Sequence, residues 1–244
     1  TATDSRDYRD GEWLEIRSIV GSDVSFKTRT LVAWTGGVDA LEPEKVFKIS
    51  PVKFSSVGVD YEGTGVYALR LSVVAYGEFH GKVKGGTSAA LSTDRLYRYK
   101  LFAERSVNSL GDGGNDYGCM VGNSQNVTAH EGLFYGTRVG FAIGGAPGDA
   151  RVTNRFVHVE GATLMNDNPA NHALDIHGWS EFCGYERCWA NGGGTIGGAN
   201  VYVRNCRLLA NGAAAPILLG EVVHGKYDFR GTRVDVGPNN TANR

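Results

Sequence analysis

The segment 171–179, which reads NHALDIHGW, holds the densest group of chemically able side chains in this sequence. If Leu174 and Ile176 face the interior of a strand, Asp175 and His177 point together to its outer side, about 7 Å apart. A carboxylate beside an imidazole on a rigid strand can act as general acid and base, or each group can orient the other. The spacing therefore predicts a catalytic pair at Asp175 and His177.

The segments around this pair read as strands, and helical periodicity is almost absent. Apolar and polar residues alternate in VYALRLSVVAY, RFVHVEG, NVYVRNC and KYDFRGTRVDV, as they do in half-buried strands. Turn residues separate these runs, and the sequence has 35 Gly in 244 residues, well above the usual share of about 7%. This pattern predicts an all-β protein.

A loose repeat favours one all-β architecture over the others. From Val127 onward, one six-residue pattern recurs. Its first and third positions are apolar or small, and its sixth is a small or thiol residue, as in Val127, Ala129 and Gly132. The copies begin at Val127, Val152, Cys183, Val201 and Tyr227, which are 25, 31, 18 and 26 residues apart. A second short apolar run precedes each copy, at 119–121, 141–143, 173–176, 195–196 and 217–219. Such coils, with Gly and Asn at their corners, predict a single-stranded parallel β-helix. A Greek-key sandwich, the alternative, needs no repeat in register.

The first part of the chain differs from these repeats. Residues 8–32 read as two alternating strands around a turn at 21–23, the pattern of a β-hairpin, and 46–63 reads as strand, turn and strand. We therefore expect a hairpin segment over 1–45, a β-helix body over 46–236, and a tail or the start of a further region over 237–244. The chain starts without Met, so it is expected to be a piece of a longer protein.

Charge and hydropathy argue against two classes of partner. The 25 Lys and Arg and 26 Asp and Glu give a formal net charge of −1, which does not suit a dedicated nucleic-acid-binding protein or a polybasic membrane surface. No apolar run approaches the roughly 18 residues of a membrane helix. We expect neither nucleic acid nor membrane insertion.

The four cysteines, Cys119, Cys183, Cys188 and Cys206, lack the paired spacing of metal ligands, and we predict neither a metal nor a cofactor. Cys188 and Cys206 occupy the same position of adjacent repeats, so they should stack inside the solenoid. A disulfide between the coils is the alternative. Parallel side chains are poorly directed for its dihedral angle, and we expect buried free thiols.

Longer stretches of the sequence resemble a known family. The segments GEWLEIRSIVGSDVSF, KVFKISPVKFSSVGVDYEG, NVTAHEGLF, HALDIHGWSEFCGYERCWANG and NVYVRNCRLLANG resemble the pectate-lyase-like superfamily of right-handed parallel β-helices. Within it, the likeness to bacteriophage tailspike and tail-fibre proteins is greatest, from about Tyr8 to about Val236. The resemblance is specific for the fold and not for the chemistry, because the same coils serve lyases, hydrolases, epimerases and non-catalytic fibres.

The resemblance implies a homotrimer in the virion tail, or an extracellular location, with other virion tail proteins as partners. It also implies binding, and in many such proteins cleavage, of a bacterial surface polysaccharide such as capsule, O-antigen or exopolysaccharide. Two alternatives stay open. One is a non-enzymatic structural fibre or baseplate component, and the other is a secreted bacterial polysaccharide lyase or epimerase.

For a sugar substrate, further residues join the predicted catalytic pair. Trp179 could stack on a sugar ring, and Glu186 is a third catalytic candidate, with Glu131 in a matching position of an earlier repeat. Two carboxylates about 5–9 Å apart suit glycoside hydrolysis, whereas an acidic residue with a base suits β-elimination from a uronate. The remaining substrate-binding candidates, on expected long loops, are His130, Glu160 and Asp167. The longest inserted segments, 144–155 and 165–172, flank the pair, and such insertions often build a binding groove.

Overall fold

A computed structural model describes residues 13–21, 23–27, 51–108, 116–144, 153–168, 170–210, 216–222 and 225–237. Within these residues every regular element is a strand, which confirms the predicted all-β class. None of the described segments is a helix that is long and apolar enough to cross a membrane.

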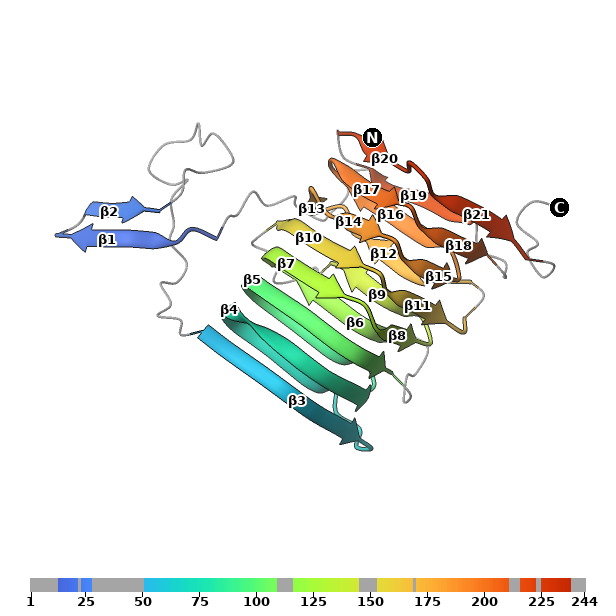
Figure 1. Ribbon diagram of the computed structural model, residues 1–244, viewed down its shortest axis with the longest axis horizontal. Coiled ribbons are helices and arrows are strands. Elements are labelled where there is room, and N and C mark those ends of the chain that lie inside the picture. The colour runs from blue at the N-terminus through green and yellow to red at the C-terminus, as the bar shows by residue number, and fades with distance from the viewer. Residues whose placement is uncertain are drawn as a thin grey trace.

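The strands form parallel sheets along a β-solenoid of about six turns, shown in Figure 1. The first face consists of β6 (Tyr117–Gly122), β9 (Val139–Ile143), β12 (Leu174–Ile176), β16 (Gly194–Gly198) and β19 (Ile217–Val222). The second face consists of β7 (Gln125–His130), β10 (Asn154–Glu160), β14 (Gly184–Glu186), β17 (Val201–Arg204) and β20 (Tyr227–Asp228). The third face consists of β8 (Leu133–Gly136), β11 (Thr163–Asn166), β15 (Trp189–Asn191), β18 (Arg207–Ala210) and β21 (Arg233–Val236). The short β13 (Ser180–Glu181) pairs with the start of β10.

Longer strands build the earlier coils. They are β3 (Pro51–Tyr61), β4 (Tyr67–Gly85) and β5 (Ala89–Val107). Strand β5 pairs in turn with β6, β7 and β8, so it runs across all three faces. Where the sequence suggests strand, turn and strand over 46–63, the structure has β3, whose register shifts between Phe54 and Val57; residues 46–50 lie outside the described part.

The predicted hairpin is confirmed for the part of it that the structure describes. Strands β1 (Ile16–Val20) and β2 (Asp23–Phe26) pair antiparallel. The residue that leads into β1 is anchored on the solenoid, because the indole Nε1 of Trp13 donates a hydrogen bond to the Asn123 carbonyl oxygen at 2.7 Å.

Inward-facing residues of successive coils stack into ladders, and one of the predicted repeats is out of register. Strand pairing aligns Val157 with Val127, so this copy begins at Val157 and not at Val152. The inserted segment before β10 shifts the strand by five residues. Its Asn154 is buried, and the amide oxygen of that side chain accepts a hydrogen bond from the Ser124 backbone N–H at 2.9 Å. In a copy that begins at Val152, this polar residue would stand in the ladder.

The corrected ladder is almost fully buried. Val127, Val157, Cys183 and Val201 are at most 1% exposed. The apolar runs of the first face stack as predicted, with Ile143 beside Ile176 and Ile176 beside Ile196. Cys188 and Cys206 are free thiols, each 2% exposed, as predicted. Continuous burial of this kind is the main source of stability in a solenoid, whose single coils cannot bury an apolar face alone.

A column of residues with left-handed backbone conformation runs along the corner at the start of the second face. Its members have φ between 50° and 57° and are Tyr76, Arg98, Asn126, Phe156, Phe182 and Asn200. We call it the corner column. The prediction that Gly and Asn form the corners holds for Asn126 and Asn200, but larger residues occupy the other positions. For such residues this conformation costs about 1–2 kcal/mol, and the pairing of neighbouring coils imposes it.

Candidate functional site

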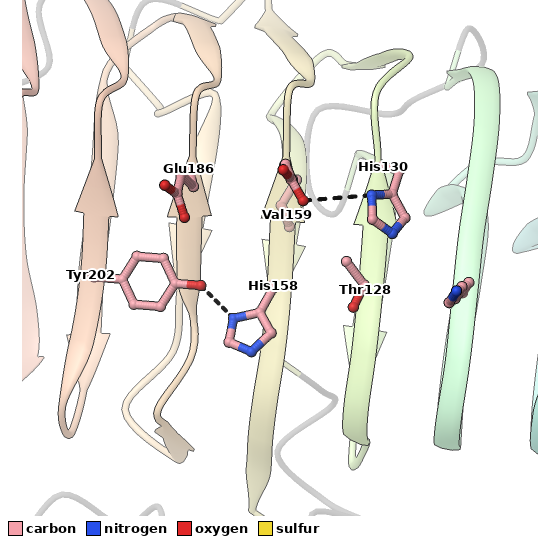
Figure 2. Close-up of a pocket in the computed structure, with 8 residues that line it drawn as sticks. Thr128, His130, His158, Val159, Glu186 and Tyr202 are labelled. Atoms are coloured by element: carbon pink, nitrogen blue, oxygen red, sulfur yellow. Dashed lines mark hydrogen bonds and ion pairs between the residues drawn. The ribbon is translucent and has the colours of Figure 1, made fainter.

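The outer surface of the second face carries an open depression of about 500 Å³, which we call the groove. Figure 2 shows the side chains that line it. They are Lys100, Thr128, His130, His158, Val159, Glu160, Glu186 and Tyr202. The groove therefore combines titratable groups of both signs with hydroxyl groups on a rigid parallel sheet.

Strand register arranges the groove in two columns of outward side chains, because alternate residues of a strand point to opposite sides. One column contains Lys100, Thr128, His158, Gly184 and Tyr202 in successive coils. The other contains His130, Glu160, Glu186 and Arg204. Neighbouring members of a column come from strands about 4.8 Å apart, so residues that are 18 to 30 positions apart in sequence lie side by side.

Gly184 allows a contact across an intervening coil. The Tyr202 hydroxyl group reaches over it to hydrogen-bond Nδ1 of His158 (Figure 2). A Cβ atom at position 184 would lie 2.7 Å from Cγ of Tyr202, closer than real Cβ contacts. The absence of a side chain at Gly184 thus brings a phenol and an imidazole together from coils that are not adjacent.

Burial sets the protonation states of this pair. It lowers the pKa of His158, against a smaller opposing effect of Glu186, and it raises the pKa of Tyr202. Desolvation disfavours the charged form of each group. At neutral pH the groove therefore holds an uncharged imidazole against a protonated phenol, and one group of the pair can accept a proton while the other donates one.

Two carboxylates lie beside this pair. Glu160 and Glu186 are aligned in adjacent coils, and Arg187 forms ion pairs with both, at 3.5 Å to Glu186. Nδ1 of His130 lies 3.6 Å from Glu160, and burial lowers the pKa of His130. Both carboxylates are therefore engaged as partners of a guanidinium group.

The predicted pair Asp175 and His177 does point outward together, but from the first face. Oδ2 of Asp175 lies 3.1 Å from Nε2 of His177, and the two side chains are 15% and 22% exposed. Trp179 packs on His177 with ring centroids 4.9 Å apart and is only 6% exposed, which leaves little ring surface for a sugar. Glu186 belongs to the second face, so the three residues predicted as catalytic do not form one site.

The other predicted residues divide between the groove and its surroundings. His130 and Glu160 line the groove, at the ends of β7 and β10 and not on the long loops that we expected. Glu186 is aligned with Glu160 and not with Glu131, whose φ of 46° places it at a corner. Asp167 follows β11 of the third face and accepts a hydrogen bond from the Tyr135 hydroxyl group.

Sequence reasoning missed His158, Tyr202, Lys100 and Thr128. The alternation that singled out Asp175 and His177 is also present in His158-Val159-Glu160 and could have identified this strand. Nothing in the sequence shows that Tyr202 crosses a glycine to reach His158. Across the described ranges, no three His, Cys, Asp or Glu side chains converge as metal ligands would.

Comparisons with known proteins agree with this architecture. The sequence model of the family described as "Gp49, pectin lyase-like" matches residues 84–242. The tailspike protein gp49 from Pseudomonas phage LKA1 has a TM-score of 0.68 and 26% identity, covering 93% of this chain and 38% of its own. The Gp54 tailspike of Acinetobacter baumannii bacteriophage AP22, solved in complex with A. baumannii capsular saccharide, has a TM-score of 0.68 and 24% identity, covering 93% and 38%.

A third solved structure, the tailspike gp61 of Pseudomonas phage phi297, has a TM-score of 0.73 and 18% identity, covering 94% of this chain and 39% of its own. The chain thus spans less than two fifths of the length of each of these solved proteins. No curated protein matches it.

Proposed function

Because the chain belongs to the Gp49 pectin lyase-like family, we propose that it acts in a bacteriophage tailspike, where it binds a bacterial surface polysaccharide and cleaves it in the groove. The likeness to three tailspikes supports a place in the virion tail. One of them was solved with a capsular saccharide, which supports a polysaccharide of the cell surface as the ligand.

The observation that carries the proposed cleavage is the pairing of His158 with Tyr202 in the groove. With Nδ1 of His158 donating to the phenol oxygen, Nε2 is free to accept a proton, and the Tyr202 hydroxyl group is free to give one. In a uronate, Nε2 would take the proton from the carbon next to the carboxylate. The electron pair would form a carbon–carbon double bond as the glycosidic C–O bond breaks, and Tyr202 would protonate the departing oxygen. Nδ1 of His158 then returns its proton to Tyr202, which restores the phenol, and proton exchange with solvent converts the resulting Nε2–H imidazole back to the Nδ1–H form.

We favour this β-elimination over hydrolysis. Hydrolysis by two carboxyl groups needs one of them to donate a proton to the leaving oxygen. Glu160 and Glu186 instead form ion pairs with Arg187, so they suit a role in binding hydroxyl groups and in orienting the substrate. The neutral imidazole and the protonated phenol are already in the forms that elimination uses.

The test is the degradation of purified capsular and O-antigen polysaccharides by the wild type and by Tyr202→Phe. We expect unsaturated sugar ends from the wild type, and a loss of turnover of about 10²-fold or more in the variant, with binding retained. Tyr135→Phe, which removes a hydroxyl group of the third face, is the matched control and should cleave normally. Saturated ends would indicate hydrolysis. Full activity of Tyr202→Phe would move the site elsewhere, and binding without cleavage by the wild type would favour the structural fibre.

We also propose that the protein assembles as a homotrimer through the third face, in contact with other virion tail proteins. Apolar side chains that are only half buried gather on its outer side, namely Leu133, Tyr135, Met165, Trp189 and Leu209. Apolar side chains gathered on one surface are typical of interfaces. Light scattering on the full-length protein should return a trimer mass that Trp189→Glu reduces, and a monomer mass for the wild type would contradict the proposal.

A further inference from the structure

Two phenylalanines stack at adjacent positions of the corner column. The ring centroids of Phe156 and Phe182 lie 5.3 Å apart with an angle of 7° between the ring planes. Both residues have a φ of 54°, which is uncommon for a bulky side chain. The flanking coils have Asn126 and Asn200 at this position, with φ of 57° and 54°. Asn is the residue besides Gly that adopts this conformation readily.

Core packing does not account for the aromatic rings. Phe182 is 39% exposed and Phe156 is half buried, and neither belongs to the buried core cluster. The flanking asparagines show that the corner forms without an aromatic side chain. A strained residue that gains little burial points to a role in function and not in folding.

The pair lies on the same two coils as part of one column of the groove. Phe156 precedes His158 by two residues in β10, and Phe182 precedes Gly184 by two residues. Successive strand residues are about 3.3 Å apart. The backbone of Phe156 is therefore within about 7 Å of that of His158, and the same holds for Phe182 and Gly184. Asn126 and Asn200, which flank the stacked rings, are shorter and not aromatic, and the described residues provide no third ring that stacks on the pair.

We propose that Phe156 and Phe182 form a subsite for the polysaccharide, binding the apolar C–H face of a sugar ring next to the groove. An aromatic ring offers a rigid apolar surface at a low entropy cost, and the stack presents this surface beside the acid–base pair. The inference rests on the proposed function, because it takes the groove as the place where the polysaccharide binds.

The test replaces each phenylalanine with the residue of the flanking coils. Phe156→Asn and Phe182→Asn should fold with an unchanged or higher melting temperature, because Asn suits the left-handed backbone. A panel of purified capsular and O-antigen oligosaccharides is first screened for binding to the wild type. For a saccharide that binds, each variant should raise the dissociation constant about tenfold. Phe26→Asn is the matched control, because Phe26 is also 39% exposed but lies on the hairpin, and its dissociation constant should stay that of the wild type.

Three results would overturn the inference while leaving the proposed function intact. They are unchanged affinity in both corner variants, a large drop in their melting temperature, and a loss of affinity that accompanies a smaller assembled mass in light scattering. The last would assign the rings to an interface between copies of the chain. A wild type that binds no saccharide of the panel would instead overturn the proposed function together with the inference.

Discussion

Replacing Cys206 and Cys119 by serine should lower the free energy of unfolding by different amounts. Only the surroundings of Cys206 provide hydrogen-bond partners for the new hydroxyl group. The Cys206 thiol donates to the Arg204 carbonyl oxygen at 3.1 Å and accepts from the Cys188 backbone N–H at 3.4 Å. In the next coil, the hydroxyl group of Thr232 makes the same kind of contacts, donating to the Val203 carbonyl oxygen at 2.7 Å and accepting from the Cys206 N–H at 3.3 Å.

Cys119 lies in an apolar environment instead. It is 0% exposed and stacks between Leu91 and Phe141. Burial alone raises the pKa of its thiol, so no charged or hydrogen-bonding group nearby offsets the desolvation. A hydroxyl group buried there without a partner should cost about 1–3 kcal/mol.

We therefore expect Cys119→Ser to lower the free energy of unfolding by about 2 kcal/mol and Cys206→Ser by less than about 1 kcal/mol. Urea unfolding followed by circular dichroism measures both values. An equal slope of the free energy of unfolding against urea concentration in the wild type and both variants would show that their folded and unfolded states are equally compact. Equal losses in the two variants, or a larger loss for Cys206→Ser, would refute the hydrogen bonds assigned to the Cys206 side chain.

Further predictions concern the core, the first face and the response to pH. Leu164→Ala, at a side chain that is 0% exposed, should lower the free energy of unfolding by about 3 kcal/mol in the same assay. Asp175→Asn should cleave polysaccharide at close to the wild-type rate if the groove is the site, whereas a loss of about 10²-fold would restore the catalytic role that the sequence predicts for Asp175. Burial lowers the pKa of His158 and His130, so the unfolded chain binds more protons and stability should fall as the pH drops below about 6.5. His158→Gln should flatten this dependence in unfolding curves measured between pH 7 and 5.

The alternation of residues was enough to predict the strands and their inward sides. Leu174 and Ile176 are buried and Asp175 points outward, because a strand has a period of two whatever coil it belongs to. The stacking of Cys188 and Cys206 also followed from the sequence, since an 18-residue coil with no inserted segment keeps its register. Where an insertion precedes β10, the same reasoning was wrong by five residues, because the insertion lengthens the repeat and the strand register begins at Val157.

The groove depends on how the coils turn, which the tertiary structure decides. Asp175 and Glu186 are eleven residues apart in sequence but lie on different faces, because the chain turns through the corner column at Phe182 between them. Glu160 and Glu186 are 26 residues apart and lie side by side, because one coil returns the chain to the same face. Tyr202 meets His158 only because Gly184 of the intervening coil has no side chain. Local sequence determines which way a side chain points, whereas the length and corners of each coil determine which side chains it meets.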